Sequence, residues 1–467
     1  MGLEKTVNKN SALWVTTLSA FLTPFMGSAV NIALPSIGRE FNLNAILLSW
    51  VQTSYILAAA IFLVPFGRLA DLHGRKRTFL YGISIYTASS LILGFSNSAV
   101  VLISFRVWQG IGGAMIFGTS AAILTSVFPV GERGRALGIN VAMVYLGLSL
   151  GPVAGGFLTQ QMGWRSIFFA NVPIGLAIMA VTVWKLKTEW AEAKGERFDW
   201  IGSVFYSLAL VAVMLGFSLL PGWPGAGLLV LGGLGLVLFI RWEIRAAYPV
   251  LNIALFRKNS VFAFSNLAAL INYSATFAVG FILSLYLQYI KGLSPQAAGL
   301  ILLAQPAMQA LFSPLAGRLS DRIEPRLMAS LGMALTVVGL IFLVSLREQT
   351  PPGIIVASLV ILGFSFALFA SPNTNAVMSS VEKKFYGVAS ATLGTMRLTG
   401  QMLSMGLATL IFALNLGRVK ITPENHLLFL HSAKTAFLLF AGLCFAGIFA
   451  SLARGKMHDL GQAPFSK

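Results

Sequence analysis

Gly67-Arg68-Leu69-Ala70-Asp71-Leu72-His73-Gly74-Arg75-Lys76-Arg77 places one acid and four strong cations between two long apolar runs. In lipid such an apolar run must end at an interface, so we predict a tight loop between two membrane helices. Gly67 and Gly74 permit close backbone approach or a left-handed turn. Asp71 can accept backbone N–H groups at a helix start or pair with an arginine. Taken alone, the stretch is explained equally well by a basic loop that only fixes topology.

The same pattern recurs in the second part of the chain. Gly317-Arg318-Leu319-Ser320-Asp321-Arg322 repeats the first five positions with one change, although the later glycine and basic pair are missing. A repeated loop implies a repeated half of the chain, and repeated membrane segments are typical of secondary transporters.

The composition excludes an ordinary soluble protein. Of the 467 residues, 57% are hydrophobic and 10% are charged, whereas roughly 25% are charged in soluble domains. At about 20 residues per span, the chain has room for about twelve to fourteen membrane helices. The single cysteine, Cys444, and four dispersed histidines give neither a disulfide framework nor a zinc site.

The apolar runs predict fourteen membrane helices joined by short loops. With the N-terminus inside, most of the 33 lysines and arginines fall in inner segments, so both termini are expected in the cytoplasm. The net charge of +18 is therefore topological and does not indicate a nucleic-acid partner. The first apolar run is too long for a cleaved signal peptide. The predicted spans lie near residues 12–34, 47–66, 78–96, 99–122, 136–158, 168–185, 202–220, 226–240, 261–288, 297–316, 327–346, 353–375, 387–412 and 432–452.

The predicted domain organisation follows from the repeat. We expect residues 1–190 to form one six-helix half, and residues 261–467 a second six-helix half with a short tail. Residues 191–260 would be an inserted two-helix segment with cytoplasmic linkers, because its spans are almost free of polar side chains and match neither copy. The soluble pieces are too short to bury a core, so function is expected inside the helix bundle.

Polar and small residues inside three predicted spans are the strongest functional candidates. Arg106-Val107-Trp108-Gln109-Gly110 places a cation in lipid, at roughly 2.5–3.5 kcal/mol on insertion scales, with a glutamine one turn on. Gly147-Leu148-Ser149-Leu150-Gly151-Pro152-Val153-Ala154-Gly155-Gly156 combines small residues at every fourth position with a helix-kinking proline. Arg397 and Gln401 give the second half its own buried cation. A purely structural role is open for each; Arg106 could bond the carbonyls of a neighbouring helix.

The stretches at 67–77, 106–110 and 147–156 resemble the three best-known motifs of the major facilitator superfamily, the last being typical of its antiporters. The chain more closely resembles the fourteen-helix drug:proton antiporter family, the multidrug efflux group, over nearly its whole length. Further matching stretches are Asn31-Ile32-Ala33-Leu34-Pro35, Gly163-Trp164-Arg165-Ser166-Ile167-Phe168, Asn171-Val172-Pro173-Ile174-Gly175, Phe198-Asp199-Trp200, 249–258 and Leu293-Ser294-Pro295.

This resemblance implies an all-α membrane transporter whose halves rock between inward-open and outward-open states, with the 67–77 loop latching the cytoplasmic side shut. It further implies proton antiport driven by the proton gradient, with protons, a small-molecule substrate and the lipid bilayer as partners. We expect a monomer in the plasma (inner) membrane. The residues expected to take part in gating are Gly67, Asp71, Gly74, Arg75, Lys76, Gly151, Pro152, Gly155 and Asp321.

The chain departs from the family in the first helix, where Met26 occupies the place usually held by an aspartate. None of the fifteen acids lies well inside a predicted span, whereas proton-coupled export of cations normally needs a buried carboxylate. We expect Arg106 to be satisfied by neutral oxygens such as Asn31 and backbone carbonyls, by water or by an anionic substrate group. Each neutral polar group could instead be simple interhelical bonding, worth about 0.6 kcal/mol. The candidate pathway residues are Met26, Asn31, Arg106, Gln109, Asn272, Tyr273, Gln305, Gln309, Asn373 and Arg397.

These features favour export of small amphiphilic compounds, neutral to anionic, with proton antiport implied by the resemblance alone. The missing carboxylate supports an alternative, which is a facilitator or a translocator of lipid-like amphiphiles or organic anions without proton coupling. A membrane enzyme would need a nucleophile, base or metal cluster at depth, and no such grouping of His, Cys, Asp or Glu exists in the sequence. We therefore expect no catalytic residue, metal or cofactor. A transporter-like receptor would need a sizeable soluble domain.

Overall fold

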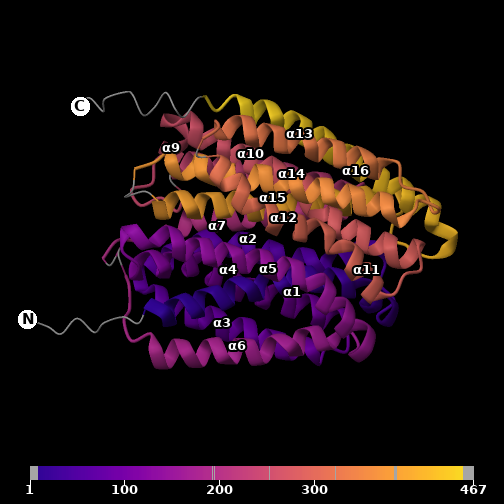
Figure 1. The fold of residues 1–467 in the computed structure, drawn as a ribbon, viewed down its shortest axis with the longest axis horizontal. Helices are drawn as coiled ribbons and strands as arrows, with labels where there is room; N and C mark the ends of the chain where they lie inside the picture. Colours follow the sequence, from indigo (N-terminus) through magenta and orange to yellow (C-terminus); the bar gives the residue numbers. More distant parts are fainter. Residues whose placement is uncertain are drawn as a thin grey trace, which may run out of the picture.

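The computed structural model describes residues 9–455 except 192, 194, 252, 321 and 383–385. This described part contains helices and no strand. The long helices run side by side along the longest axis of the molecule (Figure 1). The end of the bundle at which α1 begins and α16 ends is called the terminal face here, and the other end the opposite face.

The helices fall into three sets along the chain. The first set is α1 (Lys9–Glu40), α2 (Ala45–His73), α3 (Arg75–Gly94), α4 (Ala99–Val127), α5 (Val130–Met162) and α6 (Arg165–Lys185). The second set is α7 (Trp200–Leu219) and α8 (Trp223–Glu243), followed by the short α9 (Ile253–Lys258). The third set is α10 (Ser260–Leu285) with its π-helical end η1 (Tyr286–Ile290), α11 (Pro295–Leu302), α12 (Ala304–Leu319), α13 (Pro325–Val344), α14 (Pro352–Ser379), α15 (Tyr386–Asn415), the short 3-10 turn η3 (Pro423–Asn425) and α16 (His426–Leu452).

Side chains with short polar groups fix several helix starts. The Asn44 side chain accepts a hydrogen bond from the backbone N–H of Leu47 at 2.9 Å, and Ser294 accepts one from Ala297 at 3.2 Å. These contacts satisfy N–H groups that have no partner in the first turn of a helix. The loops between helices can therefore be short.

Thirteen of the described helical segments are long and apolar enough to cross a membrane, by length and composition. The α3 helix is not among them, because it begins with Arg75-Lys76-Arg77 and carries several hydroxyl side chains. The predicted count of fourteen spans therefore stays a prediction. The predicted span 297–316 is also broken, since α11 ends at Leu302 and α12 starts at Ala304; Pro306 lacks the N–H that would bond the Leu302 carbonyl.

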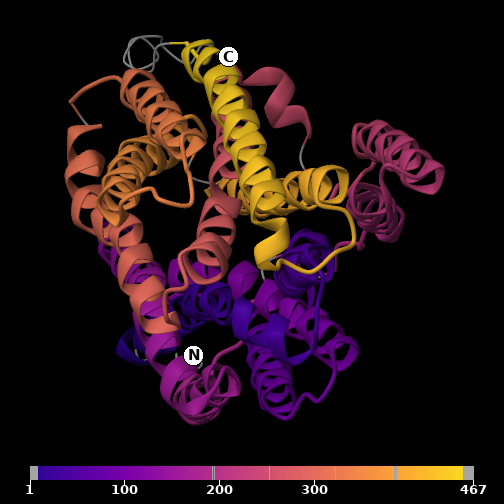
Figure 2. The same cartoon turned by 90° about the vertical axis from the view of Figure 1, so that its right-hand side faces the viewer.

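The packing of the first six helices is repeated by the third set. In the first group α1 packs on α5 and α6, while α4 packs on α2 and α3 and α3 packs on α6. In the third set α10 packs on α15 and α16, while α14 packs on α12 and α13 and α13 packs on α16. Figure 2 shows the two groups one above the other, with the first in indigo and magenta and the other in orange and yellow. The two-half architecture predicted from the repeated motif is thus confirmed.

The α7 and α8 helices form a pair at the edge of the bundle (Figure 2). The α7 helix contacts α2 of the first half and α15 of the second half. On α8 the side chains of Val230, Leu231 and Leu234 are 64%, 61% and 57% exposed. Such a continuous exposed apolar surface suits lipid rather than water.

The 67–77 stretch differs from the predicted loop. The α2 helix continues through it to His73, and α3 begins at Arg75, so the connection is the single residue Gly74 with φ 126°. Helices can extend beyond an apolar run because long basic side chains reach water from the helix end. In the second copy α12 likewise continues to Leu319, and Asp321 lies outside the described residues.

Hydrogen bonds between the halves gather at the opposite face, where α1 meets α10. Pro35 lacks the N–H that would bond the carbonyl of Asn31, and the Ser284 hydroxyl donates to this carbonyl at 2.5 Å. Gln288 Nε2 donates to the Ile32 carbonyl at 2.9 Å. The proline in α1 therefore exposes a backbone acceptor that the second half uses.

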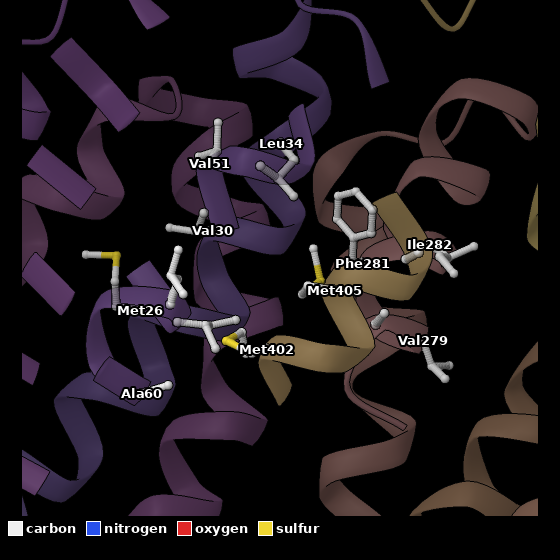
Figure 3. Packing of buried hydrophobic residues seen from close by; sticks show 14 of the residues in the cluster. Met26, Val30, Leu34, Val51, Ala60, Val279, Phe281, Ile282, Met402 and Met405 are labelled. Atoms are coloured by element: carbon white, nitrogen blue, oxygen red, sulfur yellow. The ribbon is translucent and has the colours of Figure 1, made fainter. Parts of the chain in front are cut away.

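The same seam is packed with apolar side chains. Figure 3 shows Met402 and Met405 of α15 between side chains of α1 and α2 on one side and Phe281 of α10 on the other. Val30, Phe281 and both methionines are fully buried. Next to this seam, α5 and α11 touch backbone to backbone, because a Cβ at Gly299 would collide with the Pro152 carbonyl.

We predict that Gly299→Val opens the opposite face. The valine side chain has no room against the α5 backbone, so α5 and α11 must separate. Gln160 and Gln296 lie on the two sides of this contact, with the Gln296 backbone N–H 3.3 Å from Gln160 Oε1. Cysteines at these two positions should be joined by a short thiol cross-linker several-fold less in Gly299→Val than in the parent.

The background for this measurement is Cys444→Ser, which removes the single native cysteine. The matched control is Gly227→Val on α8, where an added Cβ meets nothing within 4 Å. Equal cross-linking in Gly299→Val and in the control would show that the α5–α11 contact does not hold this face closed.

Candidate functional site

A cluster of charged groups ties α2, α3 and α4 together at the terminal face. Arg75 Nε donates to Asp71 Oδ1 at 2.9 Å, and Nη1 donates to Ser126 Oγ at 2.6 Å. Arg75 is only 7% exposed, so these contacts with a carboxylate and a hydroxyl offset part of the cost of burying its charge. Asp71 pairs with an arginine, which is one of the two roles expected from the sequence.

The linker between α6 and α7 forms a strap over this cluster. Both carboxylate oxygens of Glu189 accept from the first turn of α3, from the backbone N–H of Lys76 at 2.8 Å and of Arg77 at 3.2 Å. A carboxylate at a helix N-terminus satisfies free N–H groups and is favoured by the helix dipole. The positive φ of Gly74 lets the backbone pass beneath Glu189, where a Cβ would clash.

Three further contacts hold the strap. The backbone N–H of Arg75 donates to the Trp190 carbonyl at 2.8 Å, and that of Ala193 donates to the Asp71 carbonyl at 3.0 Å. Arg68 also forms an ion pair with Glu196. The sequence predicted the basic stretch but not this strap, because nothing in the linker composition says which helix end it covers.

In the first half, Arg106 on α4 is fully buried among neutral acceptors. Its Nε donates to the Val51 carbonyl at 3.0 Å, Nη1 to Gln109 Oε1 at 2.6 Å and Nη2 to Gln52 Oε1 at 3.1 Å. The guanidinium also lies 4.4 Å from the centre of the Tyr55 ring, a favourable cation–π geometry. Each guanidinium nitrogen therefore has a protein partner.

Neutral oxygens satisfy Arg106 as expected, but Asn31 does not supply one of these hydrogen bonds. Gln109 extends the network by donating to Ser90 Oγ at 2.8 Å. The Asn31 amide lies instead beside Gly280 of α10, and its Oδ1 is buried without a described hydrogen-bond partner. Arg106 therefore joins α2, α3 and α4, while Asn31 lies at the boundary between the halves.

Met26 and Asn272 occupy equivalent places in the two halves. Met26 is fully buried with its sulfur 3.9 Å from Asn171 Nδ2 of α6. Asn272 is fully buried with its Nδ2 3.9 Å from the Cys444 sulfur of α16. Both side chains thus pack inside their own half, so neither shares the boundary position of Asn31.

Sequence reasoning missed a second buried arginine, Arg454. Its Nη1 donates to Asn373 Oδ1 at 3.1 Å and Ser265 Oγ at 3.3 Å, and its Nε donates to the Ser451 carbonyl at 2.8 Å. Burial lowers the pKa of Arg454 to about 10, which leaves it charged at neutral pH. In the sequence Arg454 follows the last apolar run, so its position indicates a tail residue. In the structure it lies just after α16 and is buried in the bundle.

Of the two candidate pathway arginines, Arg106 is buried and Arg397 is only half-buried. Its Nη2 donates to Thr374 Oγ1 at 2.7 Å, and its Nε is buried without a described partner. The guanidinium lies 5.8 Å from the centre of the Tyr273 ring. Arg397 therefore retains hydrogen-bonding capacity that Arg106 has already used.

The remaining candidates lie on α12 and α5. The Gln305 carbonyl of α12 packs against Gly363 of α14, and Gln309 is 6% exposed. On α5, Gly151 and Gly155 pack directly against α1, while the carbonyl of Pro152 faces α11. The small-residue stripe thus places α5 in close contact with a helix of each half.

Among the described residues, no group of three or more His, Cys, Asp or Glu side chains gathers in a way that could hold a metal ion. The polar groups at depth are instead arginines with neutral oxygens, serines, threonines and amides. Together with the two-half fold, these features define a polytopic membrane transporter.

The chain belongs to the Major Facilitator Superfamily, whose family model matches residues 16–254 and 266–464. The riboflavin transporter RibZ of Clostridioides difficile is 28% identical over 93% of this chain and 95% of its own. The multidrug resistance protein Stp of Mycobacterium tuberculosis is 32% identical over 89% of this chain and 77% of its own.

A solved structure shares the fold at low sequence identity. It is a bacterial homologue of the human lysosomal transporter Spinster, with a TM-score of 0.68 and 15% identity over 97% of this chain and 98% of that one. The recognition of the superfamily from the motifs is thereby confirmed, and its relatives include multidrug resistance proteins.

We predict that Asp71→Asn lowers transport several-fold while membrane expression stays close to that of the parent. The amide keeps the shape of the side chain but removes the negative charge that pairs with the nearly buried Arg75. Asp321→Asn should do less, because the second copy lacks the later glycine and basic pair. Transport and surface expression are measured side by side, and equal losses from both variants would contradict a gating role.

We predict that Arg106→Ala lowers the unfolding temperature and abolishes transport of every substrate. It leaves Gln52, Gln109 and the Val51 carbonyl without their donor, and each orphaned acceptor costs about 1–3 kcal/mol. Arg106→Lys should recover little, because one ammonium cannot replace the planar fork. Thermal unfolding in detergent is the measurement. Retained stability with selective loss of anionic substrates would instead mark Arg106 as a substrate-binding residue.

Proposed function

We propose that the protein is a secondary active exporter of small amphiphilic organic compounds that works by alternating access. The observation that carries this proposal is the closed seam between the halves at the opposite face. Hydrogen bonds from Ser284 and Gln288 to α1 carbonyls, together with the α5–α11 contact, join the halves at the opposite face. A seam of this kind can open at the opposite face while the bundle closes at the terminal face.

We assign the terminal face to the cytoplasmic side of the plasma membrane. Most of the 33 lysines and arginines belong to the segments expected there, in accord with the positive-inside rule. Opening of the halves at the terminal face would then admit substrate from the cytoplasm. The name of the relative Stp, a multidrug resistance protein, supports hydrophobic drug-like compounds as substrates.

We further propose that residues 1–190 and 261–467 are the rocking halves and that residues 191–260 are an insertion carried with them. The close packing of α5 against both α1 and α11 supports Gly151, Pro152 and Gly155 as a surface on which the halves move. The cluster of Asp71 and Arg75 would hold the terminal ends of α2 to α4 as one unit during this motion. The protein would act as a monomer.

For substrate contact, we favour Arg397, Tyr273 and Asn31 among the candidates. Arg397 has an unused buried N–H and lies against an aromatic ring, which together offer a charge and an apolar face to an amphiphile. Asn31 is at the α1–α10 boundary with a free Oδ1. Arg106 and Gln109 would act indirectly, by fixing the helices that carry these groups.

A second candidate function is facilitated or lipid-amphiphile transport without proton coupling. In the described residues the place of the family aspartate is held by Met26, which packs against Asn171 inside its own half. The relative RibZ, a riboflavin transporter, shows that a protein similar over nearly the whole chain can take a single vitamin.

Transport by purified protein in liposomes, with and without an imposed pH gradient, separates these functions. A matched pair of anionic and neutral amphiphiles and a permanent monovalent cation serve as substrates. Gradient-dependent movement of the amphiphiles supports proton antiport, whereas equal movement in both conditions supports a facilitator. No movement of any amphiphile would contradict the proposed substrate class.

We predict that Arg397→Gln lowers transport of the anionic member of the pair about tenfold or more and that of the neutral member far less. The loss of one charge-assisted hydrogen bond is worth about 1.5–3 kcal/mol, and stability should change little because Arg397 is only half-buried. Arg418→Gln, at an exposed site between α15 and α16, is the matched control. An equal reduction for both substrates would contradict direct contact with the anionic group.

A further inference from the structure

Two acids meet where the inserted helix pair reaches the terminal face. Asp199 precedes α7, and its Oδ1 accepts the backbone N–H of Gly202 at 2.9 Å. The indole Nε1 of Trp242 on α8 donates to both Asp199 oxygens at 3.0 Å. Asp199 therefore has two hydrogen-bond donors, one from the backbone of α7 and one from a side chain of α8.

Glu243, the last residue of α8, lies beside Asp199 in a more enclosed position. It is only 3% exposed, and its Oε2 accepts the backbone N–H of Leu251 at 2.9 Å. Its Oε1 is buried with no hydrogen-bond donor among the described residues. Glu243 Oε1 and Asp199 Oδ2 each lie 2.5 Å from the point that a Cβ on Gly202 would occupy, so the orphaned oxygen faces the neighbouring carboxylate.

No described cation neutralises this pair. Of the charged groups on the packed elements, Arg68 of α2 pairs with Glu196, and neither Arg241 of α8 nor Arg245 after it forms an ion pair with either acid. The hydroxyl of Tyr206 on α7 donates to the Ala60 carbonyl of α2 at 3.2 Å. Two carboxylates so placed repel each other, which favours retention of one proton between them.

We propose that Asp199 and Glu243 form a proton-binding site. The proton is carried by Glu243 Oε1, which donates a hydrogen bond to Asp199 Oδ2, and this proton is bound and released during transport. This inference rests on the proposed function and names the group that couples it to the pH gradient. The half-buried Asp199 connects the site to the aqueous side. The proton occupies the one acceptor of Glu243 that the protein leaves unsatisfied.

Release of the proton acts on the connection to the second half. Two adjacent anions separate, and Glu243 also holds the backbone of Leu251, which leads through α9 into α10. Val250 and Phe239 lie next to Val64 and Pro65 of α2 around a packing gap too small for a water molecule. A shift of this segment therefore reaches both halves, one through α2 and the other through α10.

The first test measures the proton itself by infrared titration of the purified protein in lipid nanodiscs. The wild-type protein should show a protonated carboxyl band that disappears as pH rises through the neutral range. Glu243→Gln should abolish this band while preserving the fold, because the amide can still donate to Asp199 and accept from Leu251. Asp199→Asn should also abolish the titration of this band in the neutral pH range.

Glu40→Gln is the matched control. Glu40 also ends a helix, but Arg165 pairs with it and Trp164 donates to it at 2.7 Å, so its removal should leave the band unchanged. Trp242→Phe removes a donor from the Asp199 anion and should move the midpoint of the band to higher pH by about one unit. A structural role alone would not produce this shift.

The second test measures transport against pH on the terminal side. Glu243→Gln mimics the protonated state permanently, so its transport should lose the pH dependence of the parent. Persistence of the band in Glu243→Gln, or an unchanged transport profile in that variant, would overturn the proposal. The infrared result does not depend on transport: a wild-type protein that moves no substrate but shows the titrating band contradicts the proposed function and supports the proton site.

Discussion

The absence of water in the bilayer core is the constraint on which the rest of this structure depends, because every polar group there must find a partner within the protein. Arg106 satisfies this constraint by hydrogen bonds to three neutral oxygens and by contact with an aromatic ring. Arg454, just beyond the last span, is satisfied in the same way by Asn373 and two serines. Each arginine joins several helices of one half at a single point. Such networks make each half a unit that can move as a whole, since separation of its helices would strand a charge in lipid.

The boundary between the halves obeys the same constraint in a different way. Proline in α1 removes an N–H and leaves the Asn31 carbonyl to be satisfied from outside its own helix, and Ser284 of α10 takes that place. The bond is made by neutral groups and is reinforced by apolar side chains (Figure 3). A neutral bond is worth about 0.5–1.5 kcal/mol, far less than a buried ion pair costs to break. This difference in bonding supports the proposal that the halves move as units and separate where they meet.

Much of the architecture could be predicted from the sequence, because apolar length and the placement of basic residues directly reflect the membrane. The contact between Arg106 and Gln109 could be predicted as well, since residues three apart share a helix face. The direction in which Met26 and Asn272 point could not, because these helices are apolar on nearly every face and carry no amphipathic signal. Nor could the strap of Glu189 or the burial of Arg454, which depend on how distant segments pack.

The described acids lie at helix ends and loops and not at depth, and two groups of them gather at the terminal face. One linker joins its two acidic centres. After α6 the chain passes Glu189 and Glu196, which hold the ends of α2 and α3, and it finishes at Asp199, which begins α7 beside Glu243. At the proposed proton site, a change of charge at Asp199 and Glu243 would act through this short linker on the cluster around Asp71 and Arg75. In the described part of the chain no carboxylate lies inside either half, so the proposed coupling of a proton to the motion of the halves would need a connection of this kind, which the inserted helix pair can supply.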